Sequence, residues 1–391
     1  MNKYIMKFED SLKAIMPYSA FWLIRWGLPL KKEKYFFMSM GGNSYGDSVK
    51  NLSDFIKEHC PNAEIIWAFS SYYYDKVDCD CHKVKLYSFE YYYHIITSKY
   101  ISTNFSCKKM MLIKRRHQVK LQTWHGTALK RIGDDAKISD HSKLALLFRP
   151  DTLGTEAKRT DIFISGSSFM TEVYHRALKY PHKIYETGMP RNDIFFHNRP
   201  EITKKIRDYY GIDENKRIIL YAPTFRPDRK FTYYDVDLNA IKTFFQNKTG
   251  KEFVIYVRLH SGLLTKSKEL SRFFSKGIVN ATLYPDIQEL LYGADVLVTD
   301  YSSSMFDFMY TYRPVIMYVP DKKLYNRGFY FDLEELPFIK VNHNGELSAK
   351  LASFNEVEYK NSINKFLKYI GSVDNGNATE KVYSLLLNNA E

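Results

Sequence analysis

The sequence predicts an α/β protein with two domains, each built around a parallel β-sheet, and three observations lead to this. The chain has 391 residues, which suits two domains of ordinary size. Apolar residues make up 45% of it, which is enough for two packed cores. Strand-like segments alternate with helical patterns along the chain, as they do in βαβ units.

Nine segments are predicted strands, because each is short, rich in Ile, Val, Phe, Tyr or Leu, and followed by Gly, Ser, Pro or Thr. Helical patterns lie between many of them, such as Phe169–Leu178 and Ile287–Tyr292. The predicted strands are Tyr35–Met40, Glu64–Phe69, Lys120–Trp124, Asp161–Ser165, Lys183–Glu186, Arg217–Ala222, Glu252–Arg258, Asp295–Thr299 and Val315–Val319.

The polar stretch Phe196–Lys204, which contains Pro200, is the predicted domain boundary. The two domains would then span residues 1–200 and 201–391. Ligands of parallel sheets bind beyond the carboxyl ends of the strands. We therefore expect the functional residues in the loops that follow the predicted strands.

The net charge of +13 predicts a negatively charged partner. Nucleic acid, an anionic membrane surface and a phosphate-bearing substrate all suit this charge. Lysines and arginines are scattered along the chain and no nucleic-acid-binding motif is present, so nucleic acid is not an expected partner.

The apolar stretch Ala14–Ile24 has no cleavage site after it and is interrupted by Pro17. It is too short to cross a bilayer, which takes ~20 apolar residues. Basic residues flank it within residues 1–34. The sequence leaves two interpretations open: a segment lying in a membrane interface, or a helix packed on the protein body.

The four cysteines, Cys60, Cys79, Cys81 and Cys107, are too few and too unevenly spaced for a disulfide framework. The segment Cys79–His82 lacks the second cysteine pair that zinc would need. We expect reduced thiols and no metal.

The first candidate motif follows the predicted strand Lys120–Trp124. Gly126 lets the backbone approach a ligand closely. Thr127 is predicted to cap a helix, whose free N–H groups favour an anion. His125 would then accept a proton beside a phosphate. The alternative is a structural histidine bonded to a loop.

Two further motifs follow strands of the second half. Pro223 and Thr224 end one strand, with Arg226 nearby as a phosphate-type donor. Arg258 and His260 end another and point the same way on an extended chain, so they could grip a pyrophosphate together. The alternatives are an ordinary turn and a solvated loop edge.

The most informative motif is the serine cluster that follows the strand Asp295–Thr299. The hydroxyls of Ser302 and Ser303, with the start of a predicted helix, form a potential anion site. Ser304 and Asp307 have the spacing of a capping box, and Asp307 could instead accept from a sugar or glycerol hydroxyl. The alternative is a bare helix cap.

Several well-known catalytic motifs are absent from the sequence. There is no GxxxxGK[ST], GxSxG or HExxH motif. The pair Asp235 and Asp237 lies in a polar loop, unlike a catalytic metal site. We therefore expect chemistry without a metal or a cofactor.

Taken together, the motifs resemble the CDP-glycerol glycerophosphotransferases, the teichoic-acid glycerol- and ribitol-phosphate transferases of the TagF and TagB type. The resemblance spans about Lys120 to Phe338, and Ala128 departs from it, because the family usually has Pro there. The matching motifs are Trp124-His125-Gly126-Thr127, Thr187-Gly188-x-Pro190-Arg191-Asn192-Asp193, Ala222-Pro223-Thr224, Arg258-x-His260, Tyr284-Pro285-Asp286-Ile287-Gln288-Glu289-Leu290, Thr299-Asp300-Tyr301-Ser302-Ser303, Asp307 and Arg327-Gly328-Phe329-Tyr330.

The resemblance implies a GT-B fold of two facing Rossmann-like domains with a cleft between them, the first on the acceptor side and the second binding the CDP donor. It implies transfer of glycerol phosphate or ribitol phosphate from a CDP-polyol to a lipid-linked or polymeric polyol-phosphate acceptor, with release of CMP, in teichoic acid or capsule synthesis. It also implies a peripheral protein on the cytoplasmic face of the membrane. A GT-B sugar-nucleotide glycosyltransferase is the nearest alternative.

The resemblance also implies which residues form the site. His125 and His260 are the predicted catalytic residues, with His125 as the general base. Arg258, His260 and the serines would stabilise charge on the pyrophosphate. The predicted substrate-binding residues are His125, Gly126, Thr127, Ala128, Leu129, Arg191, Pro223, Thr224, Arg258, Leu259, His260, Ser302, Ser303 and Asp307.

Overall fold

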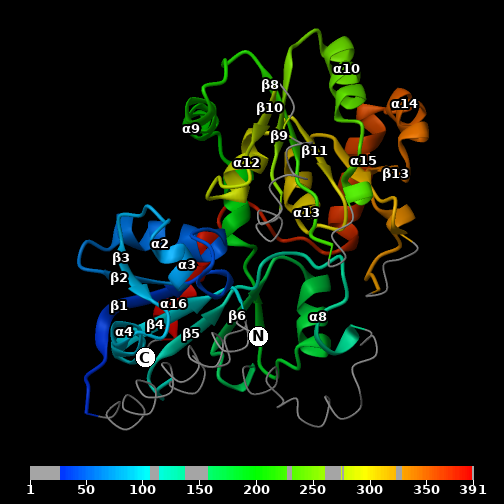
Figure 1. Ribbon diagram of the computed structural model, residues 1–391. Helices are drawn as coiled ribbons and strands as arrows, with labels where there is room; N and C mark the ends of the chain where they lie inside the picture. The colour runs from blue at the N-terminus through cyan, green and yellow to red at the C-terminus, as the bar shows by residue number, and fades with distance from the viewer. Residues whose placement is uncertain are drawn as a thin grey trace, which may run out of the picture. The chain divides into compact units, whose positions relative to one another are not determined.

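A computed structural model describes residues 27–105, 114–136, 157–226, 231–259, 274, 277–322 and 328–389 (Figure 1). The chain forms two compact units. Unit 1 comprises residues 1–125, 142–193 and 373–391, and unit 2 comprises residues 126–141 and 194–372. Most of unit 2 is therefore one continuous segment, residues 194–372, after which the chain returns to unit 1 at residue 373. The predicted division into residues 1–200 and 201–391 stays a prediction, and the stretch Ala14–Ile24 lies outside the described residues.

Unit 1 is built on a seven-stranded parallel sheet. Its strands are β1 (Lys31–Met38), β2 (Glu64–Phe69), β3 (His82–Lys85), β4 (Ser98–Thr103), β5 (Val119–Gln122), β6 (Ile162–Ser165) and β7 (Ile184–Glu186). Its helices include α2 (Asp47–His59), α3 (Ser71–Tyr74), α4 (Phe89–Thr97), α8 (Ser168–Ala177) and α16 (Ala378–Asn388). The strand order is β3-β2-β1-β4-β5-β6-β7.

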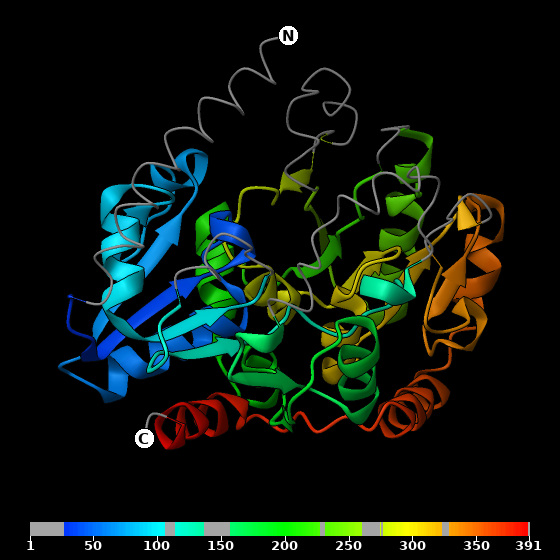
Figure 2. The same ribbon diagram turned by 90° about the horizontal axis from the view of Figure 1, so that it is seen from below.

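Both faces of this sheet are apolar, because successive side chains of a strand point to opposite faces. Phe37 and Trp67 pack in one core with residues of α2 and α16. Their neighbours Phe36 and Ile66 pack in a second core with residues of α4. Figure 2 shows α16, in red, lying along this unit, so the C-terminal segment completes the core that begins with β1.

Unit 2 is built on a six-stranded parallel sheet. Its strands are β8 (Arg217–Tyr221), β9 (Phe253–Val257), β10 (Ile278–Asn280), β11 (Val296–Thr299), β12 (Val315–Tyr318) and β13 (Ile339–Val341), in the order β10-β9-β8-β11-β12-β13. Its helices include α9 (Pro200–Tyr210), α10 (Leu238–Thr249), α12 (Ile287–Gly293), α13 (Ser304–Phe308), α14 (Asn344–Ala352) and α15 (Glu356–Tyr369).

The core of unit 2 lies between this sheet and the helices α10 and α14. Ile219 lies opposite Ile255 of β9 and Val296 of β11, and all three side chains are buried in one cluster with Ile241 of α10. These β-branched residues suit strands that are covered by protein.

All nine predicted strands are present, although their ends shift by a few residues and β1 begins at Lys31 rather than Tyr35. Four strands were not predicted. Three of them, β3, β10 and β13, have three or four residues, too few to give a periodic signal. The fourth, β4, begins with Ser98 and Lys99 and follows α4 without a turn, so its sequence looks like a helix end.

The expectation of reduced thiols is wrong for one pair of cysteines. Cys79 and Cys81 form a disulfide, with Cα atoms 5.4 Å apart. The number and spacing of the cysteines argue against a framework of several disulfides, but they do not exclude a single bond between residues two positions apart. Cys60 is a free thiol, and Cys107 lies outside the described residues.

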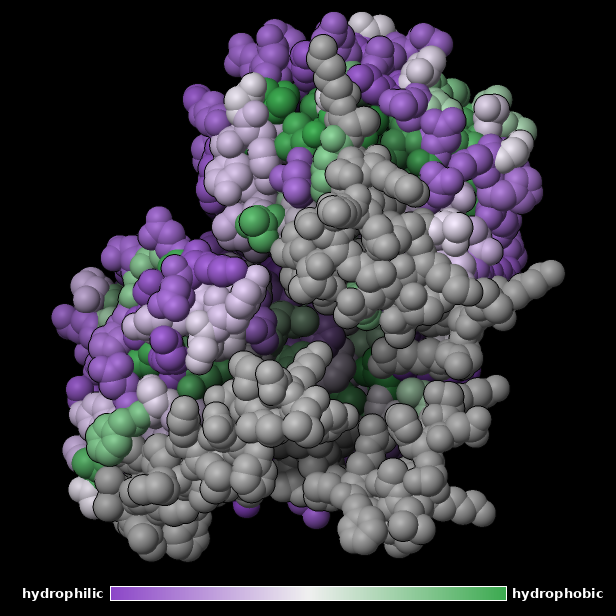
Figure 3. Space-filling model, in the orientation of Figure 1, coloured by the Kyte–Doolittle hydropathy of each residue, from purple (hydrophilic) through white to green (hydrophobic). Residues whose placement is uncertain are grey.

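Within the part of the chain that the structure describes, no helix has the length and apolar character that a membrane crossing requires. On the face seen in Figure 3, hydrophilic residues predominate over the outer described surface.

Candidate functional site

Each sheet has one place where the direction of strand addition reverses. In unit 1 this switch point lies between β1 and β4, and in unit 2 it lies between β8 and β11. Ligands of open parallel sheets bind at the carboxyl edge near such points. The predicted site residues follow strands at these edges, as the sequence indicates.

His125 follows β5 and is held by the loop after β4. Its Nδ1 lies 3.0 Å from the carbonyl oxygen of Asn104. Because a carbonyl can only accept, Nδ1 carries the hydrogen, and the neutral ring keeps a lone pair on Nε2. Burial lowers the pKa of His125, an effect that outweighs the Asn104 hydrogen bond and the nearby Asp47 carboxylate. The imidazole is therefore neutral near pH 7 and able to accept a proton.

Asn104, which the sequence analysis missed, joins the two strands at the switch point of unit 1. Its buried side chain accepts from the Met40 N–H at 2.7 Å and donates to the Ser39 hydroxyl at 3.2 Å. It thus links the end of β4 to the loop after β1 while its own carbonyl holds His125. Recognising β4 would have placed Asn104 at a strand end and made it a candidate.

Arg191 lies in the turn Pro190–Phe196, and its side chain is buried rather than on the surface. Its guanidinium donates to the carboxylate of Asp47 at 3.2 Å and to the backbone carbonyl of His125 at 2.7 Å. Asp47 in turn accepts from the Ser48 N–H at 2.6 Å, at the start of α2. These contacts position His125, and a contact between Arg191 and the substrate stays a prediction.

The rest of this motif binds the C-terminal segment of unit 1. The carboxylate of Asp193 accepts from the N–H groups of Ala378 and Thr379, at 3.0 and 2.8 Å, and so caps α16. The carboxylate of Asp374 accepts from the Met189 N–H at 2.7 Å. The motif therefore has a structural function that its sequence did not reveal.

The predicted helix at Thr127 is wrong, because residues 123–132 form a loop that precedes a short turn at Gly133–Asp135. The backbone of this loop is used in another way. The Tyr330 N–H donates to the Leu129 carbonyl at 2.9 Å, and the Arg131 N–H donates to the Gly328 carbonyl at 3.1 Å. This pairing within unit 2 excludes a helix, and it buries Leu129 beside Ala128.

In unit 2, Thr224 and Asp300 join the two strands at the switch point. The Thr224 N–H donates to both carboxylate oxygens of Asp300, at 2.9 and 3.1 Å. Pro223, the preceding residue, is buried. The backbone N–H of Thr224 is thus bound within the fold, to Asp300.

Arg226 is not a phosphate donor, contrary to expectation. It is buried and lies within 2.9 Å of the Asp300 carboxylate and 2.6 Å of the Asp321 carboxylate. The Tyr301 hydroxyl also donates to Asp321, at 3.1 Å. Burial alone would lower the pKa of Arg226, but the hydrogen bond to Asp321 and the two carboxylates raise it. Its charge is used to hold the loops after β8, β11 and β12 together.

The serine cluster begins α13, but without the predicted capping box. Ser302 Oγ accepts from the Ser304 N–H at 3.3 Å and from the Ser304 hydroxyl at 2.8 Å, whereas Ser303 makes no side-chain cap bond. Ser304 is therefore bound to Ser302 and not, as predicted, to Asp307. Ser302 and Ser303 are partly exposed, and Asp307 is buried.

Arg258 follows β9, and its guanidinium donates to the carbonyls of Ala281, at 3.4 Å, and Tyr284. The Leu259 N–H donates to the Thr282 hydroxyl at 3.1 Å, and the Leu259 side chain is buried. These bonds hold the loop after β9 against residues 281–284. His260 lies outside the described residues.

The sequence matches a family model described as "CDP-Glycerol:Poly(glycerophosphate) glycerophosphotransferase" over residues 20–388. The chain belongs to this family. The predicted resemblance and the predicted type of enzyme, a glycerophosphotransferase, are therefore confirmed.

Curated relatives agree with the family. The chain is 30% identical to the teichoic acid poly(glycerol phosphate) polymerase of Bacillus spizizenii, over 99% of each protein. It is 31% identical to the teichoic acid glycerol-phosphate transferase of Staphylococcus aureus, over 90% of this chain and 92% of that protein. A polymerase of Staphylococcus epidermidis is 31% identical over 91% of this chain, which spans about half, 51%, of that longer relative.

Among solved structures, the wall teichoic acid polymerase TagF matches with a TM-score of 0.81 and 28% identity, over 99% of this chain and 98% of that chain. With the two parallel sheets described above, this match confirms the predicted α/β fold of the GT-B type.

Proposed function

We propose that this glycerophosphotransferase uses CDP-glycerol as its donor, transfers glycerol phosphate to the hydroxyl of a polyol-phosphate acceptor, and releases CMP. The glycerol donor is preferred to ribitol because the relatives named for glycerol phosphate are 26–31% identical to this chain, whereas those named for ribitol phosphate are 23% and 25% identical.

The observation that carries the chemistry is the hydrogen bond from His125 Nδ1 to the Asn104 carbonyl. It leaves Nε2 as the acceptor of the neutral ring. In the proposed step the acceptor hydroxyl gives its proton to Nε2 while its oxygen forms a bond to the β-phosphorus. The bond from that phosphorus to the CMP oxygen breaks, and CMP leaves with the electron pair. Phosphoryl-type transfer depends mainly on positioning and electrostatics, which suits a site of this kind.

We propose that the groups of unit 2 bind the diphosphate. Ser302 and Ser303 present partly exposed hydroxyls at the carboxyl edge of β11, next to the loop that Asp300 and Arg226 hold rigid. Arg258, fixed by two backbone carbonyls, and His260 would add positive charge at the end of β9. Asp307 would accept from a hydroxyl of the polyol.

The acceptor is proposed to be a lipid-linked or polymeric polyol phosphate, met at the cytoplasmic face of the membrane. The net charge of +13 and the basic residues within residues 1–34 support binding to an anionic surface. Teichoic acid synthesis is the proposed pathway, because the glycerol-phosphate relatives carry that name.

The proposal is tested by incubating the protein separately with CDP-glycerol, CDP-ribitol and UDP-sugars, each with a polyol-phosphate acceptor. We expect CMP from CDP-glycerol and a lengthened acceptor by mass spectrometry. UDP released from a UDP-sugar with transfer of the sugar would favour the glycosyltransferase alternative. Equal turnover of CDP-ribitol would remove the donor preference, and no nucleotide release from any donor would contradict the proposal.

A further inference from the structure

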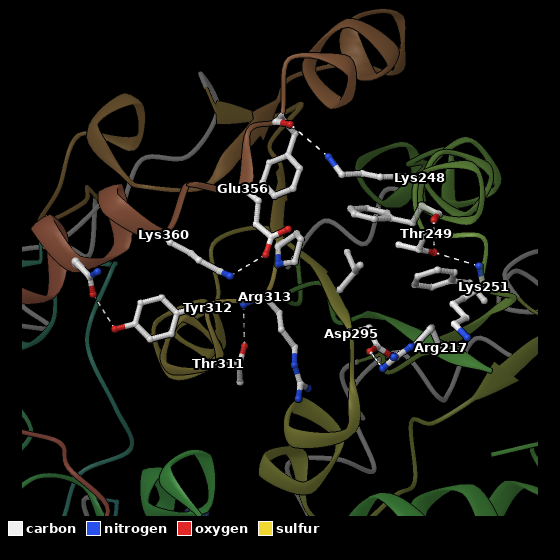
Figure 4. Close-up of a pocket in the computed structure, with 16 residues that line it drawn as sticks. Arg217, Lys248, Thr249, Lys251, Asp295, Thr311, Tyr312, Arg313, Glu356 and Lys360 are labelled. Atoms are coloured by element: carbon white, nitrogen blue, oxygen red, sulfur yellow. Dashed lines mark hydrogen bonds and ion pairs between the residues drawn. The ribbon is translucent and has the colours of Figure 1, made fainter. Parts of the chain in front are cut away.

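A cavity of about 780 Å³ lies at the amino end of the sheet of unit 2, away from the motifs discussed above (Figure 4). It is lined by residues at the starts of four strands: Arg217 of β8, Phe253 of β9, Val296 of β11, and Pro314 just before β12. Thr224 and Ser302 follow the opposite, carboxyl ends of β8 and β11. The volume is within the usual range of ligand sites, but the position differs from the one where α/β sheets bind nucleotides.

The wall of the cavity combines aromatic rings with lysines. Phe245, Phe253 and Phe354 supply the rings. Figure 4 shows Lys248 and Lys251 coming from the end of α10 and the chain after it, and Lys360 coming from α15. Lys248 lies 4.9 Å from the centre of the Phe354 ring, so ring and cation form one surface.

The charges of this wall sum to +3, because five cations face two carboxylates. Both carboxylates already have a basic partner: Asp295 binds Arg217 at 2.9 Å, and Glu356 binds Lys360 at 2.7 Å. The hydrogen bond from Lys360, and to a smaller extent the charge of Lys248, lowers the pKa of Glu356. Arg313 donates instead to the carbonyls at the end of α12, at 2.7 and 2.6 Å.

The remaining cations of this wall are Lys248, which donates a hydrogen bond to the Phe354 carbonyl at 3.5 Å, and Lys251. Both are exposed, and neither has a carboxylate within ion-pair distance among residues 27–105, 114–136, 157–226, 231–259, 274, 277–322 and 328–389. An exposed lysine pair beside aromatic rings matches a ligand with several separated negative charges joined by short carbon units.

We propose that this cavity binds a stretch of phosphodiester polymer of the poly(glycerol phosphate) type, away from the reacting atoms. The inference rests on the proposed function, since such a polymer is the product of the proposed reaction and an acceptor for it. Lys248 and Lys251 pair with successive phosphates, and the partly exposed Phe354 ring contacts the glycerol carbons. A second point of attachment keeps a long acceptor on the enzyme between transfers by raising its local concentration.

The test compares the wild type, the double variant Lys248→Glu/Lys251→Glu, and the control Lys350→Glu/Lys368→Glu. The control makes the same change in net charge at two exposed lysines that do not line the cavity and that lie, like Lys248, in the last turn of a helix. Binding of a labelled poly(glycerol phosphate) oligomer is measured by fluorescence anisotropy. CMP release is measured with this oligomer and with a single-unit acceptor.

We expect the oligomer to bind the double variant at least about tenfold more weakly, because two attractive contacts become repulsive, and the control to stay within about twofold of the wild type. The KM for the oligomer should rise in parallel, while kcat and the KM for the single-unit acceptor should not change. Unchanged oligomer binding in the double variant, or an equal loss in the control, would overturn the inference.

Two further measurements distinguish the proposed polymer site from a lipid-binding site and from a failure of the proposed function. Phosphatidylglycerol vesicles test a lipid surface: if the double variant loses vesicle binding and keeps oligomer binding, the cavity is a lipid site and the proposal is wrong. The binding assay needs no turnover. If the wild type releases no CMP from any CDP-polyol and oligomer binding still depends on Lys248 and Lys251, the proposed function fails and the polymer site stands.

Discussion

The switch points of the two sheets have the same place in their folds but use it differently. In unit 1 the loop after β4 holds a neutral imidazole through the Asn104 carbonyl, which leaves Nε2 of His125 as the acceptor, and Arg191 binds the backbone carbonyl of His125. In unit 2 the loops after β8, β11 and β12 enclose a buried guanidinium between two carboxylates, with serine hydroxyls at the edge. In the proposed mechanism, the switch point of unit 1 accepts the proton, and that of unit 2 presents hydroxyl groups on a rigid base.

The comparison also shows that a charged residue in a motif can be bound by partners within the fold. Arg191 and Arg226 both follow strands; the first was a predicted substrate-binding residue and the second a predicted phosphate donor. Each is buried against carboxylates: Arg191 on Asp47, and Arg226 on Asp300 and Asp321. A buried cation without such a partner would be costly, so burial itself explains the pairing.

The largest effect is expected at His125. His125→Ala should reduce kcat by about 10²- to 10⁴-fold, the usual contribution of a general base, because it removes the proposed acceptor of the proton. CMP release under saturating CDP-glycerol measures kcat, and titration calorimetry with CDP-glycerol should show that the donor still binds. Turnover within a few-fold of the wild type would mean that unit 1 has no general base at its switch point.

The next effect concerns stability rather than chemistry. Arg226→Ala should lower the free energy of unfolding by about 3–5 kcal/mol, because two buried carboxylates would lose their common partner. Arg226→Lys keeps the charge but loses the forked geometry, so it should recover part of this loss. Urea unfolding followed by fluorescence gives both values. Similar stability for all three proteins would show that the Arg226 cluster does not hold the loops of unit 2.

The smallest effect is a shift in pH dependence. Since burial lowers the pKa of His125, the wild-type kcat should rise with pH through a value below 6.5 and be level at pH 7. In Asn104→Asp the new carboxylate favours the imidazolium and raises that pKa. The acidic limb should therefore move to higher pH by roughly half to one unit.

Asn104→Ala is the control for this shift, because it changes the Asn104 side chain without adding a charge, and its acidic limb should stay near that of the wild type. If Asn104→Asp leaves the limb unchanged, a group other than His125 controls the rate in acid.

Much of the fold could be read from the sequence because strand signals are local. All nine predicted strands exist, since each is an apolar run followed by a turn residue. The site could be read less completely. His125 and the serines were found because they directly follow recognisable strands. Asn104 was missed because β4 begins with polar residues. Thr127 was assigned to a helix because the segment Gly328–Tyr330, which pairs with the backbone of Leu129 and Arg131, lies about 200 positions away in the chain.

The sequence by itself determined the family, the two-unit α/β plan and the positions of the motifs, because these depend on local pattern and order. Only the tertiary structure decided which polar groups remain available. Arg226 is neutralised by Asp321, which is distant in sequence, and His125 is oriented by a carbonyl from another strand. A hydrogen bond or ion pair depends on distances of about 3 Å between atoms, and the chain sets such distances only when it folds.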